Sequence, residues 1–123
     1  MNQYNIYVGL NDQFTRKQMH DTERYVKILK HICKAYRASF TFSVQEGGYI
    51  YENGNLEHEK SLHISMVDQP EETVNAVARD LCTFFNQESV LIVQSDVKMY
   101  YMNGEREVID HISSKHKINT DEA

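Results

Sequence analysis

The chain has 123 residues, a formal net charge of −5, 41% apolar residues and 25% charged residues, which is typical of one globular domain. A single Pro, no Trp and the absence of biased runs exclude a disordered or collagen-like chain. No apolar run approaches the roughly 20 residues that span a bilayer, and the first residues lack the basic lead of a secretory signal. We therefore expect a cytoplasmic protein without a membrane anchor.

The first predicted element is a half-buried strand over residues 4–10, where apolar and polar residues alternate. A polar loop follows, to about Met19. Next comes a helix that Asp21 can cap, because an Asp side chain accepts hydrogen bonds from the first free backbone N–H groups. One face of this helix is apolar, and the opposite face is basic through Arg24, Lys27, Lys30, Lys34 and Arg37.

A β-hairpin is predicted next. Residues 39–45 alternate, Gly47 and Gly48 indicate a bulge or bend, and the strand continues through residues 49–51. Asn53-Gly54 is a strong turn signal, since both central residues of a tight hairpin turn need positive φ. The returning strand turns every second residue inward, namely Leu62, Ile64 and Met66.

A second helix is predicted to start at residues 68–72, with Asp68 as the capping acid and an early Pro70. Its apolar stripe ends at Phe84 or Phe85, and Asn86 ends the helix in the left-handed conformation. A short apolar strand follows over residues 89–93, Asp96 interrupts it, and residues 97–102 resume it. We expect one domain over residues 1–103 and a polar extension over residues 104–123, with a short helix around residues 108–112 and a frayed end.

The predicted order β-α-β-β-α-β is the ferredoxin-like arrangement, an α+β fold with a four-stranded antiparallel sheet and two helices on one face. This topology places the exit of the first strand, the hairpin tip and the entry to the last strand at one end of the sheet.

Two stretches, Ile6-Tyr7-Val8-Gly9-Leu10 and Phe85-Asn86-Gln87-Glu88-Ser89-Val90-Leu91, resemble a family of small uncharacterised bacterial ferredoxin-like proteins. That family has a Phe-Gly-Gln-Glu-Ser-Val-Leu junction, and this chain has Asn86 in place of the Gly. The resemblance spans residues 4–102. It implies the fold, and it does not indicate which activity, if any, the protein has.

Charge is distributed unevenly. Residues 1–37 sum to +4, residues 38–97 to −8 and the remainder to −1. An acidic, tyrosine-bearing hairpin can dock on a basic protein surface, and in size and charge the chain is similar in type to anti-CRISPR proteins. The favoured function is therefore a non-enzymatic interaction module, and one form of it is a phage or mobile-element inhibitor that docks on a basic nucleic-acid-handling partner. The predicted contacts come from Glu46, Tyr49, Tyr51, Glu52, Glu57 and Glu59.

A polar cluster is expected where the first strand ends and the last strand begins, formed by Asn11, Asp12, Gln87, Glu88 and Ser89. Two carboxylates at such a place can hold a cation or support acid/base chemistry. The alternative is structural, with Glu88 or Ser89 capping free backbone groups at the junction.

The outward face of the sheet is the second surface of interest, and it is predicted to display Tyr7, Thr41, Ser43, His63, Ser65 and Tyr100. Tyrosine-rich surfaces are common in protein interfaces, so a homodimer through this face is expected. The alternative function is a dimeric small-molecule-binding protein or small enzyme with its pocket on this face. A housekeeping or regulatory dimer with an unknown ligand is the third hypothesis.

Other site classes lack support in the sequence. Neither the two cysteines nor the six histidines have zinc-ligand spacing, so no metal, cofactor or catalytic residue is assigned. Cys33 and Cys82 are expected to be free thiols in a reducing compartment. Acids beside the sheet face disfavour direct nucleic-acid binding there, and the bases of the first helix are the surface that a phosphate backbone would contact.

Overall fold

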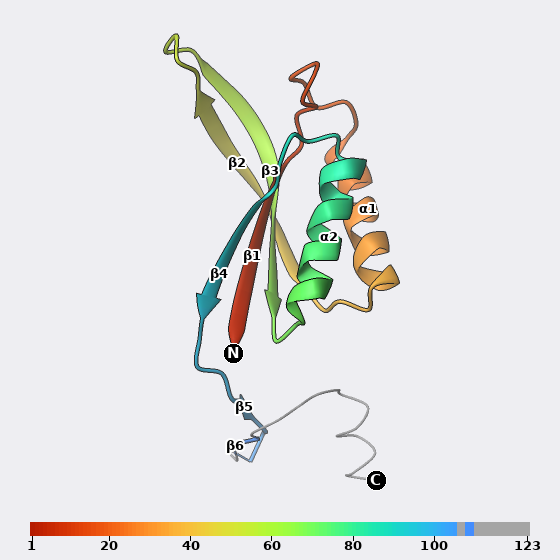
Figure 1. The fold of residues 1–123 in the computed structure, drawn as a ribbon, viewed down its shortest axis with the longest axis vertical. Helices are drawn as coiled ribbons and strands as arrows, with labels where there is room; N and C mark the ends of the chain where they lie inside the picture. The colour runs from red at the N-terminus through yellow and green to blue at the C-terminus, as the bar shows by residue number, and fades with distance from the viewer. Residues whose placement is uncertain (106–107, 110–123) are drawn as a thin grey trace.

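The computed structural model describes residues 1–105 and 108–109. The predicted element order is confirmed: β1 (Asn2–Gly9), α1 (Thr22–Ala35), β2 (Thr41–Ile50), β3 (Leu56–Val67), α2 (Glu71–Phe84) and β4 (Leu91–Asp96). The four strands form one antiparallel sheet in the order β2-β3-β1-β4. Both helices cover the same face of this sheet (Figure 1), so the ferredoxin-like prediction is correct.

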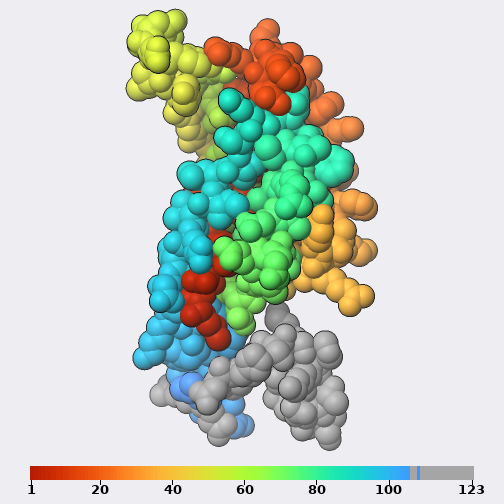
Figure 2. Space-filling view, viewed as in Figure 1, coloured from red at the N-terminus to blue at the C-terminus, as the bar shows by residue number. Residues whose placement is uncertain are grey.

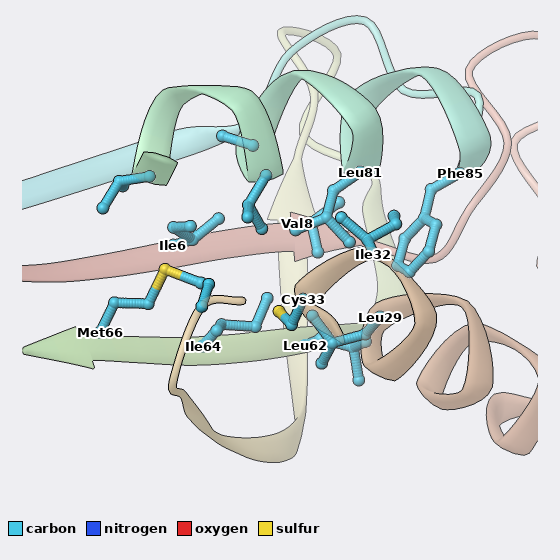
Figure 3. Close-up of a cluster of buried hydrophobic side chains, with 14 of the residues drawn as sticks. Ile6, Val8, Leu29, Ile32, Cys33, Leu62, Ile64, Met66, Leu81 and Phe85 are labelled. Atoms are coloured by element: carbon cyan, nitrogen blue, oxygen red, sulfur yellow. The ribbon is translucent and has the colours of Figure 1, made fainter. Parts of the chain in front are cut away.

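The core lies between this face and the helices, as Figure 3 shows. Alternate residues of β1 and β3 are buried, among them Ile6 and Ile64, which are opposite each other and fully inaccessible. Helix α1 contributes Tyr25, Leu29 and Ile32, and α2 contributes a stripe at the predicted spacing: Val74, Val77, Ala78 and Leu81. Of the two candidate phenylalanines, Phe85 is buried and its ring packs edge-on against Tyr25, whereas Phe84 is 62% exposed.

The hairpin is longer than the strands beside it. Residues Glu46 to Ile50 of β2 pair with Leu56 to Lys60 of β3, whereas β1 pairs with β3 only over Ser61 to Val67. The distal part of the hairpin therefore projects beyond the sheet, at the end where β1 exits and β4 begins (Figure 1). This projection forms one wall of the site described below.

Asp21 caps α1, because its carboxylate accepts the backbone N–H of Arg24 at 3.0 Å. The prediction that Asp68 caps α2 is wrong. The N-cap is Pro70, which makes no side-chain capping bond, and Asp68 lies two residues earlier with φ 57°. The reversal between β3 and α2 passes through the left-handed conformation of Asp68, which an Asp adopts more readily than most residues. Asn86 is left-handed as predicted, with φ 49°.

The C-terminal part differs most from expectation. Asp96 closes β4 instead of interrupting it, and its carboxylate lies 3.4 Å from the N-terminal ammonium group. Beyond it the described residues contain two short strands, β5 (Tyr101–Met102) and β6 (Val108–Ile109), which pair with each other. Residues 108–109 are therefore extended, where a helical turn was expected. The rest of the expected helix and frayed end lies outside the described residues, and the domain boundary at residue 103 stays a prediction.

None of the helices in the described part of the chain is long and apolar enough to cross a membrane.

Candidate functional site

Three segments that are distant in sequence meet at the end of the sheet where the hairpin projects. They are the loop after β1, the distal part of the β2–β3 hairpin and the α2–β4 connection. Figure 2 shows the hairpin tip and the loop after β1 projecting at the same end of the molecule, with the start of β4 below them. Between them lies an open cleft of about 410 Å³, lined by Asn11, Asp12, Gln13, Arg16, Tyr49, Tyr51, Glu57, Glu59, Gln87, Glu88 and Ser89. This volume is within the range of ligand sites, roughly 300–1,000 Å³.

The cleft brings together two sets of residues that were predicted separately. All five residues of the polar junction cluster line it, and so do Tyr49, Tyr51, Glu57 and Glu59 of the acidic hairpin. Glu46 does not line the cleft but an adjoining cavity between the hairpin and the loop after β1, which shares Asn11 and Glu59 with the cleft. Glu52 lies in an open depression at the hairpin tip, which shares Tyr49 and Tyr51 with the cleft. Sequence reasoning missed Arg16 and Gln13, because no periodic pattern marks a residue in an irregular loop.

Asn11 holds the three segments together. Its backbone N–H donates to the Glu59 carboxylate at 3.1 Å, and its side-chain amide donates to Glu57 at 3.4 Å. From the other side, the Gln87 amide donates to the Asn11 carbonyl oxygen at 2.6 Å. Gln87 therefore connects the α2–β4 junction to the β1 exit, and Asn11 connects that exit to β3.

The absence of a side chain at Gly9 leaves the space that the Glu59 carboxylate occupies. A Cβ atom at Gly9 would lie 2.5 Å from Glu59 Oε2 and 2.6 Å from Glu59 Cδ. The Glu59 side chain thus lies directly over the Gly9 backbone, which only the missing side chain allows. From the sequence, Gly9 is predicted only to lie in the strand over residues 4–10, and no role in a site is assigned to it.

The loop after β1 is fixed by Asp12. Its carboxylate accepts the backbone N–H groups of Phe14 and Thr15 at 2.8 and 3.0 Å, and it also accepts the side-chain amide of Asn86. These bonds, those from Thr15 and Asn86 first, hold the pKa of Asp12 below its usual value. Asp12 therefore stays ionised and keeps the loop joined to the end of α2.

The aromatic wall of the cleft comes from the hairpin. The rings of Tyr49 and Tyr51 meet edge-to-face with centroids 5.1 Å apart, and the Arg16 guanidinium lies 4.7 Å from the Tyr51 ring centroid. The Tyr51 hydroxyl donates a hydrogen bond to Glu57, which raises the pKa of that hydroxyl. The cleft thus combines π-faces, four carboxylates and one guanidinium.

The chemical class of ligand follows from this lining. The carboxylates outnumber the single cation, so the cleft favours a positively charged ligand that also has a flat ring for the tyrosines. Within the described residues, no group of three or more His, Cys, Asp or Glu side chains is arranged to hold a metal ion.

Comparison with known proteins identifies the family. A family model described as S-adenosylmethionine lyase matches residues 12–123, which is most of the chain and includes every residue of the cleft except Asn11. The chain belongs to the S-adenosylmethionine lyase family. A search of curated protein sequences gives no match.

Solved structures agree with this assignment. A phage SAM lyase in its apo state is 30% identical, with a TM-score of 0.60, over 76% of this chain and 78% of that chain. A phage SAM lyase in complex with S-methyl-5'-thioadenosine is 28% identical, with a TM-score of 0.61, over 77% of this chain and 80% of that chain. Pyrococcus horikoshii CutA, at 15% identity over 78% of this chain and 85% of its own, shares the fold with a TM-score of 0.51.

The prediction of a non-enzymatic, anti-CRISPR-like inhibitor is therefore wrong, and the family match overturns it. The family implies an enzyme, which is the alternative function predicted from the sequence. The charge distribution misled because the hairpin acids were read as an outward docking surface, whereas Glu57 and Glu59 face a cleft. The Phe-Asn-Gln-Glu-Ser-Val-Leu junction motif stays an untested resemblance.

The other two predicted surfaces lie elsewhere. Tyr7, Thr41, Ser43, His63 and Ser65 share the open face of the sheet, where Tyr7 stacks on His63 at 4.6 Å. Tyr100 follows β4 and belongs to no strand of this sheet. The bases Arg24, Lys27, Lys30, Lys34 and Arg37 are all exposed along α1 and just after it, outside the cleft. A homodimer through the sheet face, and contact of nucleic acid or a protein partner with either surface, stay predictions.

Proposed function

We propose that this chain is an S-adenosylmethionine (SAM) lyase, which cleaves SAM and releases S-methyl-5'-thioadenosine from the cleft between the hairpin and the β1 exit loop. The observation that carries the proposal is the family match over residues 12–123. A phage SAM lyase with S-methyl-5'-thioadenosine bound, 28% identical to this chain, supports the product.

The products define the bond that breaks. S-methyl-5'-thioadenosine keeps the adenosyl group, the sulfur and the methyl group of SAM, so the bond between sulfur and Cγ of the amino-acid chain is cleaved. A lyase breaks this bond without water. In the proposed step, a carboxylate oxygen of SAM attacks Cγ and closes a five-membered lactone. The S–Cγ bond breaks at the same time, and its electron pair goes to the sulfur. The step transfers no proton.

The cleft suits this substrate in charge and shape. SAM carries a sulfonium, an ammonium and one carboxylate, so its net charge of about +1 is attracted by Asp12, Glu57, Glu59 and Glu88. Tyr49 and Tyr51 offer ring faces for the adenine base. S-methyl-5'-thioadenosine is neutral, so it loses that attraction once the bond has broken and leaves more readily.

Positioning is what the protein supplies in such a reaction. The nucleophile and the leaving group are parts of one molecule, and a flexible chain between them samples many unproductive conformations. A site that holds the adenosyl end and the amino-acid end at once selects the reactive conformation, an effect worth several orders of magnitude in rate.

A cytoplasmic location is part of the proposal, supported by two cysteines without disulfides, Cys33 and Cys82.

Variants of the hairpin carboxylates test the proposal. Glu59→Gln keeps the shape of the side chain and removes its charge, and we expect kcat/KM for SAM to fall by about 10- to 100-fold. Glu46→Gln is the matched control, because Glu46 is on the same hairpin but outside the cleft. If both variants have the same activity as the unchanged chain, the cleft is not the site where SAM is cleaved.

A further inference from the structure

Arg16 is the one cation among the residues that line the cleft, where four carboxylates surround the same space. Its guanidinium lies 4.7 Å from the Tyr51 ring centroid. Despite the nearby acids, Arg16 forms no ion pair with any described residue of the chain. A guanidinium in an acidic cleft that pairs with none of the acids has its donor groups available for a ligand.

The backbone holds Arg16 in this place. Arg16 has φ 60°, a left-handed conformation that is uncommon for a residue with a side chain. Its N–H donates to the Asp12 carbonyl oxygen at 2.8 Å, and the Asp12 carboxylate fixes the intervening Phe14 and Thr15. Asp12 is tied in turn to Asn86 at the end of α2. The Arg16 side chain thus extends from a turn that the hydrogen bonds of Asp12 hold in place. Uncommon backbone conformations of this kind persist mainly at functional sites.

We propose that Arg16 binds the α-carboxylate of the amino-acid end of SAM and sets the position from which a carboxylate oxygen attacks Cγ. This inference rests on the proposed function and assigns a specificity-determining residue within it. SAM presents two positive groups and one negative group, and the cleft presents several carboxylates and one guanidinium, so the charges of ligand and site are complementary. The planar guanidinium fork matches a carboxylate in shape, and such pairs are bidentate and stronger than neutral hydrogen bonds.

With Arg16 in this role, the cleft distinguishes ligands that have a carboxylate from ligands that lack one. A ligand without the carboxylate has no group for Arg16, and Arg16 then only adds repulsion toward its positive charges. Removal of the Arg16 guanidinium should therefore lower the affinity for ligands that have the carboxylate. The affinity for ligands that lack it should stay the same or rise slightly. A purely structural role of Arg16, as a cover for the Tyr51 ring, would affect both ligands equally.

Two inert probes separate these cases by isothermal titration calorimetry on the full-length chain. Sinefungin has the carboxylate and a C–NH₃⁺ group in place of the sulfonium, so it binds without reacting. Decarboxylated SAM keeps the sulfonium and lacks the carboxylate. For Arg16→Gln we expect the affinity for sinefungin to fall about 10- to 100-fold, the usual range for a lost charged hydrogen-bond pair, with less than about twofold loss for decarboxylated SAM. Arg16→Lys keeps the charge but not the fork, and it should recover part of the sinefungin affinity.

Lys17→Gln is the matched control, since Lys17 is the neighbouring exposed base and does not line the cleft. It should bind both probes like the unchanged chain. An equal loss of both probes in Arg16→Gln, or unchanged sinefungin affinity, overturns the assignment. Failure of the proposed function looks different, because the unchanged chain would then convert no SAM and bind neither probe.

Discussion

Gly9→Ala is the substitution that most directly connects the geometry of the cleft to its activity. The new Cβ atom would lie 2.5 Å from Glu59 Oε2 and 2.8 Å from Glu59 Oε1, against 3.4 Å or more for an ordinary contact. The carboxylate must therefore retreat by about 1 Å, and it loses the hydrogen bond from the Asn11 N–H, now 3.1 Å long. A displacement of about 1 Å at a reacting centre can cost on the order of 100-fold in rate.

The cost to stability should be small. Only the end of a flexible side chain has to move, and Ala in place of Gly within a strand recovers roughly 0.5–1 kcal/mol of chain entropy. The Asn11 N–H can bond to water in the open cleft. We expect the free energy of unfolding to change by no more than about 1 kcal/mol, while kcat/KM for SAM falls about 10- to 100-fold.

Steady-state kinetics and urea denaturation on the same preparations measure the two quantities. Gly47→Ala is the matched control, because a Cβ at Gly47 meets nothing within 4 Å, and it should leave activity unchanged. In a Glu59→Ala background, Gly9→Ala should have almost no further effect on rate. Normal kcat/KM for Gly9→Ala would refute the role given to Glu59, and a large loss of stability would refute the packing argument.

The remaining predictions concern the aromatic wall, the loop and the core. Tyr51→Phe keeps the ring under Arg16 but removes the bond to Glu57, so kcat/KM should fall several-fold with an unchanged circular dichroism spectrum. Because that bond raises the pKa of the Tyr51 hydroxyl, this group stays protonated between about pH 7 and 9. A fall in activity in this pH range that Tyr51→Phe abolishes would contradict the hydrogen bond from Tyr51 to Glu57. The lowered pKa of Asp12 means that its contribution to stability is complete above about pH 4 and is lost as pH falls through the folded-state pKa; thermal melts from pH 2 to 6 should show this loss in the unchanged chain and less of it in Asp12→Asn. Leu81→Ala removes a fully buried side chain and should cost about 2–5 kcal/mol in urea denaturation, and a loss below 1 kcal/mol would show that α2 is not packed as described.

The sequence was sufficient for the fold because periodicity reports burial directly. Alternation in residues 4–10 and the spacing of Val74, Val77 and Leu81 each specify one buried face, and β-α-β-β-α-β then leaves few topologies. The failures at Asp68 and at residues 108–109 have a local cause. A residue before a turn and a pair of strand residues near the chain end carry no pattern that separates a helix from its alternatives.

About half of the residues that line the cleft could be predicted as a cluster from the sequence. Topology alone predicted that Asn11, Asp12 and Glu88 would meet at one end of the sheet, and the cleft confirms this arrangement. The hairpin carboxylates were noticed but assigned to an outward surface, because sequence does not show how far a hairpin projects past its neighbours. The position of Arg16 depends on its left-handed backbone and on a loop held by the hydrogen bond between Asp12 and Asn86, which are 74 residues apart. No sequence spacing encodes that contact.

The most direct test of the proposed function is the fate of SAM itself. The purified chain is incubated with SAM in H₂¹⁸O, and the products are followed by liquid chromatography and mass spectrometry against a protein-free blank. The proposed lyase reaction yields S-methyl-5'-thioadenosine well above the blank, together with an equal amount of a four-carbon lactone that contains no ¹⁸O when first formed. SAM consumed no faster than in the blank, or a first product that already carries ¹⁸O, would contradict it.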